Sequence, residues 1–349
     1  MRIAYILPSL ACTGPIIVAA NLINQLKTRA DKIDLYYFND KCEIDFDCDT
    51  FRIDPLTHIP FDSYDIIHAH MLQPDRFIWK HRKKITAKTV STVHQFIPYS
   101  LRTDRNIIAS SIFSPLWYKY LSVADHVVYI SNSLMAESLK HISAKNTSCI
   151  YNGIDLSGAD ATIPESDLEQ IIRLKQNYKL IGNFSNFTIR KGVDQLINCL
   201  AQNSQLALLL IGDGKELNDL KKQAAKLKVA DRCLFLNFRQ EVKPYYKLLD
   251  AYAMCSRSEA FGLCLVEAAA LNVPVVCSDI PTFRELFDET EISFFKPENI
   301  SSLNLAITNS LQKNSSKITK AFQRFENNYT AKAMADGYWK LYEGLANSI

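Results

Sequence analysis

The sequence predicts an α/β protein of two doubly wound domains, in which helices cover both faces of each parallel sheet. Short apolar segments alternate with segments of helical spacing in both halves of the chain, and this alternation is typical of parallel sheets. The polar stretch 156–169 interrupts the alternation near the middle. The chain has 349 residues, enough for two domains of roughly 100–200 residues each. We expect domains at residues 1–157 and 158–329, followed by a last helix at about 330–349.

The elements of the first half follow from the spacing of their apolar residues. Strands are expected at 2–7, 33–38, 65–68, 89–93, 125–130 and 148–151. A helix is expected at 15–26, where apolar residues from Ile16 to Leu26 can share one face. A second helix is expected at 133–141, because Ser131 is a good N-cap residue. The Asn152-Gly153 turn signal ends this half.

The second half repeats the same alternation. Strands are expected at 179–184, 206–211, 233–236, 252–255 and 273–277. Helices are expected at 192–202, 216–226, 242–249 and 263–271, and over most of 301–349. Ligands of doubly wound folds bind outside the carboxyl ends of the strands, so we expect a site in the cleft between the two domains.

Composition and charge exclude several classes of protein. The formal net charge is +3 and there is no dense basic stripe, so a nucleic-acid partner is not expected. The basic cluster 80–84 is either a solvated helix end or a contact for an anionic surface. Nine cysteines without a Cys-x-x-Cys pair indicate a reducing compartment and no disulfide framework or zinc site.

The amino-terminal segment is expected to be a buried first strand and not a signal peptide, because its apolar run is short. No run approaches the ~18 apolar residues that a membrane span needs. We therefore expect a cytoplasmic protein, with peripheral contact at the inner face of the membrane still open.

The segment Ser258–Glu267 carries the strongest candidate chemistry. Glu259 lies on a loop after a strand, and Glu267 lies in the first turns of the next helix. Gly262 lets the backbone approach a ligand closely, and the helix amino terminus suits a phosphate. The two carboxylates would repel that phosphate directly, so they are better placed to bind sugar hydroxyls on either side of it. The alternative is a capped helix whose glutamates face solvent.

Arg190 and Lys191 lie between another strand and its helix. At the carboxyl end of a strand, two adjacent cations could neutralise a diphosphate and the charge that grows on it as it leaves. The alternative is a solvent-exposed basic pair before a helix.

Three weaker signals lie in the first half. Gly14 is in a phosphate-loop position, although a lone glycine before Pro15 also fits a plain turn. His94 follows a strand, where it could bind a sugar hydroxyl, act as an acid or base, or be structural. His68 and His70 form an H-x-H pair for which no third metal ligand is apparent, so no metal is expected.

These motifs resemble the retaining glycosyltransferases of family 4, which have the two-domain GT-B fold, and the resemblance covers nearly the whole chain. The most specific element is Glu259…Glu267, which is similar to the E-x7-E signature of that family. The other similar segments are Ala260–Leu263, Asn272–Val276, Asp65–His68, Tyr129–Ser133, Tyr151–Asp155, Arg190–Gly192 and Tyr338–Tyr342.

The resemblance implies a role for each matching residue. Glu259 would contact the transferred sugar, and Glu267 would bind the nucleotide ribose. Arg190 and Lys191 would hold the diphosphate. The remaining expected donor contacts are backbone amides at Gly262 and Leu263 beside Phe261, the Gly14 loop over the phosphates, the backbone around Phe238–Arg239 at the base, and His94 beside the sugar.

The resemblance also implies an organisation for the two domains. The first would face the acceptor, the second would bind the nucleotide sugar, and the last helix would pack back on the first. Two departures concern the donor site: Asn183 stands where many relatives have arginine, and Pro15 stands where many have a second glycine and therefore offers no N–H.

The function that these expectations imply is a metal-independent, retaining sugar transfer that needs no cofactor. The donor would be a nucleoside-diphosphate sugar, UDP-linked in preference to GDP-linked. The acceptor would be a glycan or a lipid-linked glycan of a bacterial cell-envelope polysaccharide. For its surface we consider the aromatic and basic segment 96–117, with Tyr99, Arg102, Arg105 and Trp117; an ordinary helical hairpin with buried aromatic residues is the alternative. Other possible functions are a degenerate subunit that supports an active partner, a sugar-nucleotide epimerase and a phosphorylase.

Overall fold

The computed structural model describes residues 1–98, 107–142, 146–312 and 315–347. The chain divides into two compact units. The first unit consists of Met1–Asp155 together with Asn328–Ile349, and the second consists of Leu156–Asn327. Tyr99, Arg102 and Arg105, three of the residues considered for the acceptor surface, lie outside the described residues.

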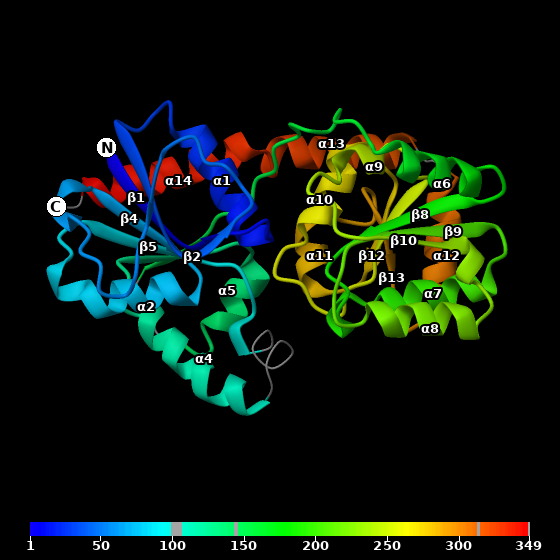
Figure 1. Ribbon diagram of the computed structural model, residues 1–349, viewed down its shortest axis with the longest axis horizontal. Helices are drawn as coiled ribbons and strands as arrows, with labels where there is room; N and C mark the ends of the chain where they lie inside the picture. Colours follow the sequence, from blue (N-terminus) through cyan, green and yellow to red (C-terminus); the bar gives the residue numbers. More distant parts are fainter. Residues whose placement is uncertain (99–106, 143–145, 313–314, 348–349) are drawn as a thin grey trace. The chain divides into compact units, whose positions relative to one another are not determined.

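The first unit contains a parallel sheet of seven strands within the described residues, in the order β3-β2-β1-β4-β5-β6-β7. Figure 1 labels β1, β2, β4 and β5 of this sheet. The strands are β1 (Arg2–Leu10), β2 (Lys32–Cys42), β3 (Asp49–Arg52), β4 (Ile66–His70), β5 (Lys88–Val93), β6 (His126–Tyr129) and β7 (Thr147–Cys149). The helices are α1 (Gly14–Leu26), α2 (Leu72–His81), α4 (Ile107–Leu121), α5 (Asn132–Ser138) and α14 (Ala331–Ala346).

The two faces of this sheet pack against different helices, because successive side chains of a strand point to opposite faces. Ala4 of β1 and Ile67 of β4 belong to the same buried cluster as Phe77 of α2. On the other face, His68 accepts or donates a hydrogen bond with Tyr342 of α14. Tyr342 is fully buried, so the last helix of the chain completes the core of the first unit.

The second unit contains a parallel sheet in the order β10-β9-β8-β11-β12-β13, counted over the residues placed in this unit. The strands are β8 (Lys179–Phe184), β9 (Leu206–Ile211), β10 (Cys233–Leu236), β11 (Ala251–Met254), β12 (Val275–Ser278) and β13 (Ser293–Phe295). The helices are α6 (Glu165–Lys175), α7 (Val193–Gln202), α8 (Leu217–Lys226), α9 (Lys243–Tyr246), α10 (Leu263–Ala270), α11 (Pro281–Leu286), α12 (Ile300–Ser310) and α13 (Ser315–Asn328).

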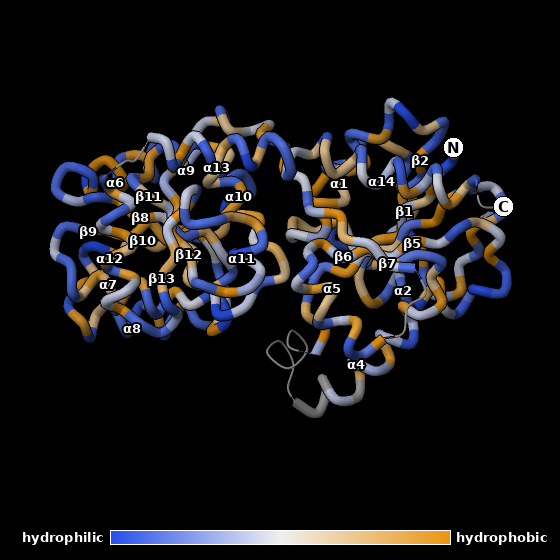
Figure 2. Tube along the Cα trace, turned by 180° about the vertical axis from the view of Figure 1, so that it is seen from behind, coloured by the Kyte–Doolittle hydropathy of each residue, from blue (hydrophilic) through white to orange (hydrophobic). Residues whose placement is uncertain are grey.

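The main core of the second unit lies between its sheet and one layer of helices. Leu196 of α7, Leu220 of α8 and Leu303 of α12 pack in one buried cluster with Leu208 of β9 and Ala253 of β11. Figure 2 shows the corresponding pattern along the trace, with hydrophobic strands inside and hydrophilic loops outside. Together the two sheets confirm the predicted fold class of two doubly wound α/β units.

Each sheet has a point at which the strand order reverses, and ligands of this kind of fold bind outside the carboxyl ends of the strands at that point. In the second unit the reversal lies between β8 and β11, which are neighbours in the sheet. In the first unit it lies between β1 and β4. The loops after these four strands are therefore where a site is expected.

The segment at the start of the second unit differs from its prediction. We expected 156–169 to be irregular, but α6 begins at Glu165, so the prediction was wrong for the end of that stretch. Glu165 and Asp167 lie in the first turn of α6, and Arg173 and Lys175 lie in its last turn. These charges complement the helix dipole, which is why a polar sequence forms a helix here.

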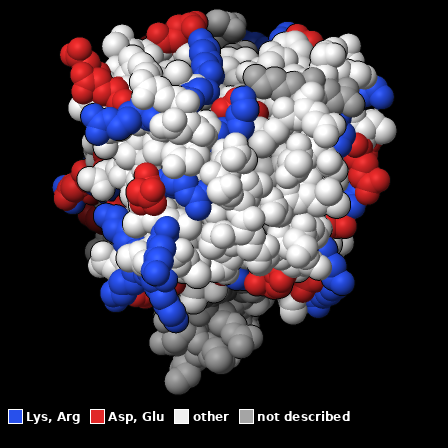
Figure 3. Space-filling view, turned by 90° about the vertical axis from the view of Figure 1, so that its right-hand side faces the viewer, with Lys and Arg blue, Asp and Glu red and all other residues white. Residues whose placement is uncertain are grey.

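The surface gives two further observations. Among the described residues, no helix is both long and apolar enough to span a bilayer. On the face that Figure 3 shows, basic and acidic side chains are interspersed around a broad area without charged side chains.

Candidate functional site

The loops after β8 and β11 bring two cations onto one carboxylate. Nζ of Lys191 lies 2.6 Å from Oε1 of Glu259, and Nη1 of Arg190 lies 3.0 Å from Oε2. The Glu259 side chain is 8% exposed, whereas those of Lys191 and Arg190 are 15% and 28% exposed. The sequence therefore identified three residues that the fold places together although 68 positions separate Lys191 from Glu259.

The cations determine the charge of Glu259. Burial alone would raise the pKa of this carboxyl, but Lys191 and Arg190 outweigh burial and lower it to about 2. The carboxylate is therefore ionised at neutral pH, and the cluster has one positive charge in excess. Such a cluster can attract an anion while it keeps a carboxylate in place.

Backbone contacts fix the two loops against each other. The amide of Arg257 donates to the carbonyl of Arg190 at 2.8 Å. Gly192 follows with a left-handed φ of 65°, and a Cβ at this position would lie 2.0 Å from the carbonyl oxygen of Cys255. Only glycine fits there, so Gly192 lets the basic pair approach the Glu259 loop.

Two residues that the sequence did not indicate support Glu259 directly. The hydroxyl of Ser256 donates to Oε1 at 2.8 Å, and the hydroxyl of Thr282 donates to the Glu259 carbonyl at 2.6 Å. Both hydroxyl groups are buried. Ser256 lies three residues before Glu259 and Thr282 lies in α11, and neither position had a pattern in the sequence that indicated this contact.

The amino terminus of α10 lies directly after this carboxylate. Gly262 caps the helix with φ 105°, and no side chain caps it, so the first amides of α10 face outward from the helix end. Phe261 is 2% exposed, and its ring therefore belongs to the interior. Gly262 and Leu263 can offer backbone N–H groups, as the sequence predicted for a phosphate.

Glu267 lies one turn further along α10 and is held differently from Glu259. The Tyr246 hydroxyl donates to its Oε2 at 3.0 Å. Burial raises the pKa of Glu267, and the Tyr246 hydrogen bond opposes that shift. Among the described residues Glu267 forms no ion pair and contacts the neutral Tyr246 hydroxyl, so this carboxylate is suited to accept hydrogen bonds from hydroxyl groups.

The structure shows what Asn183 does at the position where many relatives have arginine. This side chain is 1% exposed; its amide donates to the carbonyl of Ala253 at 2.7 Å, and its oxygen accepts from Ser185. Asn183 thus ties β8 to β11 and supplies no charge to a ligand.

The Arg239 side chain forms an ion pair inside the second unit. Its guanidinium binds both carboxylate oxygens of Asp167, at 2.8 and 2.9 Å, and the Tyr245 hydroxyl donates to the same carboxylate. Phe238 beside it is 54% exposed. The Arg239 side chain is therefore committed to Asp167, which leaves the backbone and Phe238 as the groups at this position that a nucleobase could meet.

The Gly14 loop in the first unit offers few donors. The amide of Cys12 donates to Oε2 of Glu43, and the amide of Thr13 donates to the carbonyl of Ala11. Pro15 has no amide hydrogen. Among the backbone amides of the described segment 12–15, the Gly14 amide is thus the donor left for a ligand, and the Thr13 hydroxyl, which makes no cap hydrogen bond, lies beside it.

His94 is buried beside His70. Nε2 of His94 lies 2.8 Å from Nδ1 of His70, and the rings stack with centroids 5.0 Å apart. Burial lowers the pKa of His94 to about 3. His94 is therefore neutral at physiological pH and is unsuited to donate a proton as an imidazolium.

His68 is structural. Its two nitrogens lie 2.6 Å from the Tyr342 hydroxyl and 2.8 Å from the Thr92 hydroxyl. No group of three or more His, Cys, Asp or Glu side chains among the described residues is arranged to hold a metal.

One prediction for the acceptor surface was wrong. Trp117 is 2% exposed, and its indole N–H donates to the buried carboxylate of Asp75 at 2.7 Å. The alternative interpretation, an aromatic residue inside a helical hairpin, applies to Trp117.

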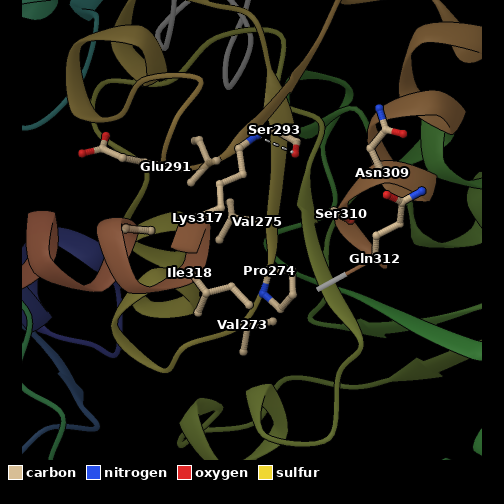
Figure 4. A pocket seen from close by; sticks show the side chains of 12 residues that line it. Val273, Pro274, Val275, Glu291, Ser293, Asn309, Ser310, Gln312, Lys317 and Ile318 are labelled. Atoms are coloured by element: carbon tan, nitrogen blue, oxygen red, sulfur yellow. Dashed lines mark hydrogen bonds between the residues drawn. The ribbon is translucent and has the colours of Figure 1, made fainter. Parts of the chain in front are cut away.

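The second unit also has a cavity of about 220 Å³ away from these loops. Figure 4 shows it between the start of α13 and the segments that enter β12 and β13, with Lys317 pointing toward Ser293. It lies at the amino ends of the strands, which is the opposite end from the site expected for this fold.

Two family descriptions match the chain. Residues 165–330 match "Glycosyl transferases group 1", and residues 56–157 match "Glycosyltransferase Family 4". The chain belongs to glycosyltransferase family 4. The first match, residues 165–330, contains Arg190, Lys191, Glu259 and Glu267. The charged residues of the candidate site therefore lie in the part of the chain that matches the glycosyltransferase description.

Individual relatives agree with this assignment. The glycosyltransferase is 28% identical over 367 aligned positions to "O-antigen biosynthesis glycosyltransferase WclY" of Escherichia coli, and the match covers 100% of both chains. A sucrose-phosphate synthase of Thermosynechococcus elongatus has the same fold, with a TM-score of 0.83, 21% identity and full coverage of both chains. Anabaena HepE, solved with UDP and glucose, has a TM-score of 0.79 and 20% identity over 98% of this chain and 99% of that one. These neighbours establish the GT-B fold that the sequence predicted.

Proposed function

We propose that the protein transfers a sugar, with retention of anomeric configuration, from a UDP-sugar to a glycan or lipid-linked acceptor of a cell-surface polysaccharide. The observation that carries the proposal is the cluster of Lys191, Arg190 and Glu259 beside the uncapped amino terminus of α10. The O-antigen role in the name of WclY supports the polysaccharide, and the UDP in the HepE structure supports the nucleotide.

In this proposal the second unit binds the donor. Lys191 and Arg190 bind the diphosphate together with the amides of Gly262 and Leu263, since cations and helix amino termini stabilise phosphate charge. Glu267 accepts the ribose hydroxyl groups. Fixed cations and amides would stabilise the leaving diphosphate without a metal ion.

Glu259 is proposed to contact the transferred sugar and not to attack it. Lys191 and Arg190 form ion pairs with both oxygens of the ionised carboxylate. A carboxylate whose oxygens are held in ion pairs is a weak nucleophile. We therefore favour front-face attack by the acceptor hydroxyl: the anomeric C–O bond to the diphosphate breaks while the new glycosidic bond forms, and the hydroxyl proton passes to the departing phosphate oxygen.

The first unit is proposed to face the acceptor and a membrane surface. Trp79 of α2 and Leu116 of α4 are each 37% exposed, and Nζ of Lys119 lies 5.3 Å from the centre of the Trp79 ring. Lys83 and Lys84 follow α2 and are exposed. Exposed aromatic and basic side chains on neighbouring helices suit an anionic lipid surface.

A donor screen tests the proposed function. Binding and hydrolysis of UDP- and GDP-sugars would be measured for the wild type and for Glu267→Ala, with Glu298→Gln as a matched control because Glu298 pairs with Arg257 at the surface. We expect UDP-sugar binding that Glu267→Ala weakens and Glu298→Gln preserves. Absence of binding to any donor would exclude the enzyme function and favour a degenerate subunit.

A further inference from the structure

His70 and His94 share a hydrogen bond that can exist in only one of two forms. Both rings are neutral, because burial lowers the pKa of each and His68 and His94 lower that of His70 further. A neutral imidazole has one N–H and one acceptor nitrogen. Either His70 donates from Nδ1 to Nε2 of His94, or His94 donates from Nε2 to Nδ1 of His70.

The surroundings of His70 distinguish these forms. His70 is fully buried, and its second nitrogen, Nε2, has no hydrogen-bond partner among the described residues. If His70 accepted the shared bond, its proton would be on Nε2, and a buried N–H would be left without an acceptor. If His70 donates, Nε2 is a bare acceptor, and orphaned buried N–H groups are rarer than under-satisfied acceptors.

We propose that His70 is a positioning residue that fixes His94 as the Nδ1–H tautomer, so that His94 presents a hydrogen-bond donor to a hydroxyl group of the substrate. His94 keeps 8% of its surface exposed, and no described residue bonds its Nδ1. The part of this proposal that concerns the substrate rests on the proposed function.

Close contacts among three histidine rings hold this arrangement in place: His70 stacks on His94 and lies tilted against His68. The ring of His70 lies with its centroid 4.4 Å from that of His68 and 5.0 Å from that of His94. His68 is in turn fixed by Tyr342 and Thr92. His70 therefore cannot turn its ring without displacing its neighbours, and the tautomer of His94 is set by the interior of the first unit.

The tautomer can be measured without any substrate. Two-dimensional NMR of the full chain labelled with 15N-histidine distinguishes a protonated from an unprotonated ring nitrogen, and the His94→Gln spectrum assigns the signal. We expect the His94 proton on Nδ1. A His94 proton on Nε2 would overturn the inference, even if sugar transfer were demonstrated.

Kinetics test the positioning role. Asparagine at position 70 can keep a donor near the place of Nδ1, whereas phenylalanine keeps a ring without a donor. We expect His70→Phe to lower kcat about tenfold, the equivalent of one hydrogen bond, with donor Kd unchanged, and His70→Asn to restore most of the rate. His126→Phe is the matched control, since His126 bonds Ser148 in the same unit.

The double variant separates positioning from general damage. If His70 acts through His94, His70→Phe should have no further effect in a His94→Ala background. An equal loss of rate in both backgrounds would overturn the positioning role. If no donor is turned over by the wild type, the proposed function fails while the NMR result still decides the tautomer.

Discussion

Glu259 and Glu267 are eight residues apart, yet the groups that contact them differ in charge. Glu259 contacts two cations, whereas Glu267 contacts the neutral Tyr246 hydroxyl. A ligand hydroxyl can therefore bind Glu267 without displacing a charge. An anion that binds Lys191 or Arg190 must compete with the Glu259 carboxylate for the same cations.

We predict opposite kinetic effects for these two residues. In Glu259→Gln, turnover should fall about 100-fold, the size typical for losing one group that stabilises developing charge, while donor Kd stays the same or falls because the cations are freed. Glu267→Ala should raise donor Kd about tenfold with a smaller effect on turnover. Calorimetry and initial rates check both values, and a Glu259→Gln variant that weakened binding without slowing turnover would contradict the assignment.

Arg190, Lys191 and Glu259 could be predicted from the sequence because each lies between the end of a strand and the start of a helix, with a glycine nearby. Ser256, Thr282 and Tyr246 could not be predicted, since their contribution depends on contacts between segments that only the fold brings together. The same limit applies to Trp117, whose partner Asp75 lies 42 positions away.

At the scale of elements, Gly192 determines how closely the loop after β8 approaches the loop after β11. We predict that Gly192→Ala destabilises the second unit by about 1–3 kcal/mol, because its φ of 65° and its contact with the Cys255 carbonyl exclude a Cβ. Donor affinity should fall with it, since Lys191 is displaced. Gly344→Ala is the control because nothing lies within 4 Å of a Cβ there, and denaturant unfolding measures the difference.

The buried carboxyl of Asp75 in α2 accepts a hydrogen bond from Trp117 of α4, and we expect this contact to make stability dependent on pH. Burial raises its pKa to about 7, although the hydrogen bonds from Ser91 and Trp117 lower it. The folded pKa exceeds the unfolded value of about 3.9, so the folded state favours the protonated form. The resulting stabilisation is complete below pH 4 and is lost as the pH rises toward 7.

We therefore predict that the free energy of unfolding of the wild type falls between pH 4 and pH 7 relative to Asp75→Asn. The expected relative change is a few kcal/mol, since one pKa unit corresponds to about 1.4 kcal/mol. Denaturant titrations at several pH values measure it, and the exposed Asp62→Asn serves as the control. Parallel pH profiles for wild type and Asp75→Asn would show that Asp75 does not titrate in this range.

The order of strands and helices could largely be predicted, because buried strands are continuous apolar runs and most helices have an apolar stripe. The short strand β3 could not, since all four of its residues are exposed and its pairing with β2 gives no apolar pattern. The start of α6 could not be predicted for a related reason. Charged residues in its first and last turns stabilise this helix, whereas the spacing of apolar residues gives no sign of where it begins.

At the scale of the whole molecule, the first unit is assembled from both ends of the chain. α14 supplies Tyr338 and Tyr342, whose hydroxyl groups bond Thr92 and His68. Ile154 also pairs with the backbone at Tyr329 and Ala331. The core of the first unit therefore depends on α14 as well as on Met1–Asp155.

We predict that a chain shortened to end at residue 327 unfolds in its first unit and stays folded in its second unit. Loss of one buried aromatic side chain typically costs about 3–5 kcal/mol, and a domain has only about 5–15 kcal/mol of stability. Without Tyr338 and Tyr342 the first unit should lose its cooperative fold, while the second unit, Leu156–Asn327, keeps its own core. Hydrogen exchange should then be fast at the amides of β4 and β5 and slow at those of β9. A chain that ends at residue 346 retains α14 and should protect both sheets; equal protection of β4 in the two chains would show that the first unit folds without its last helix.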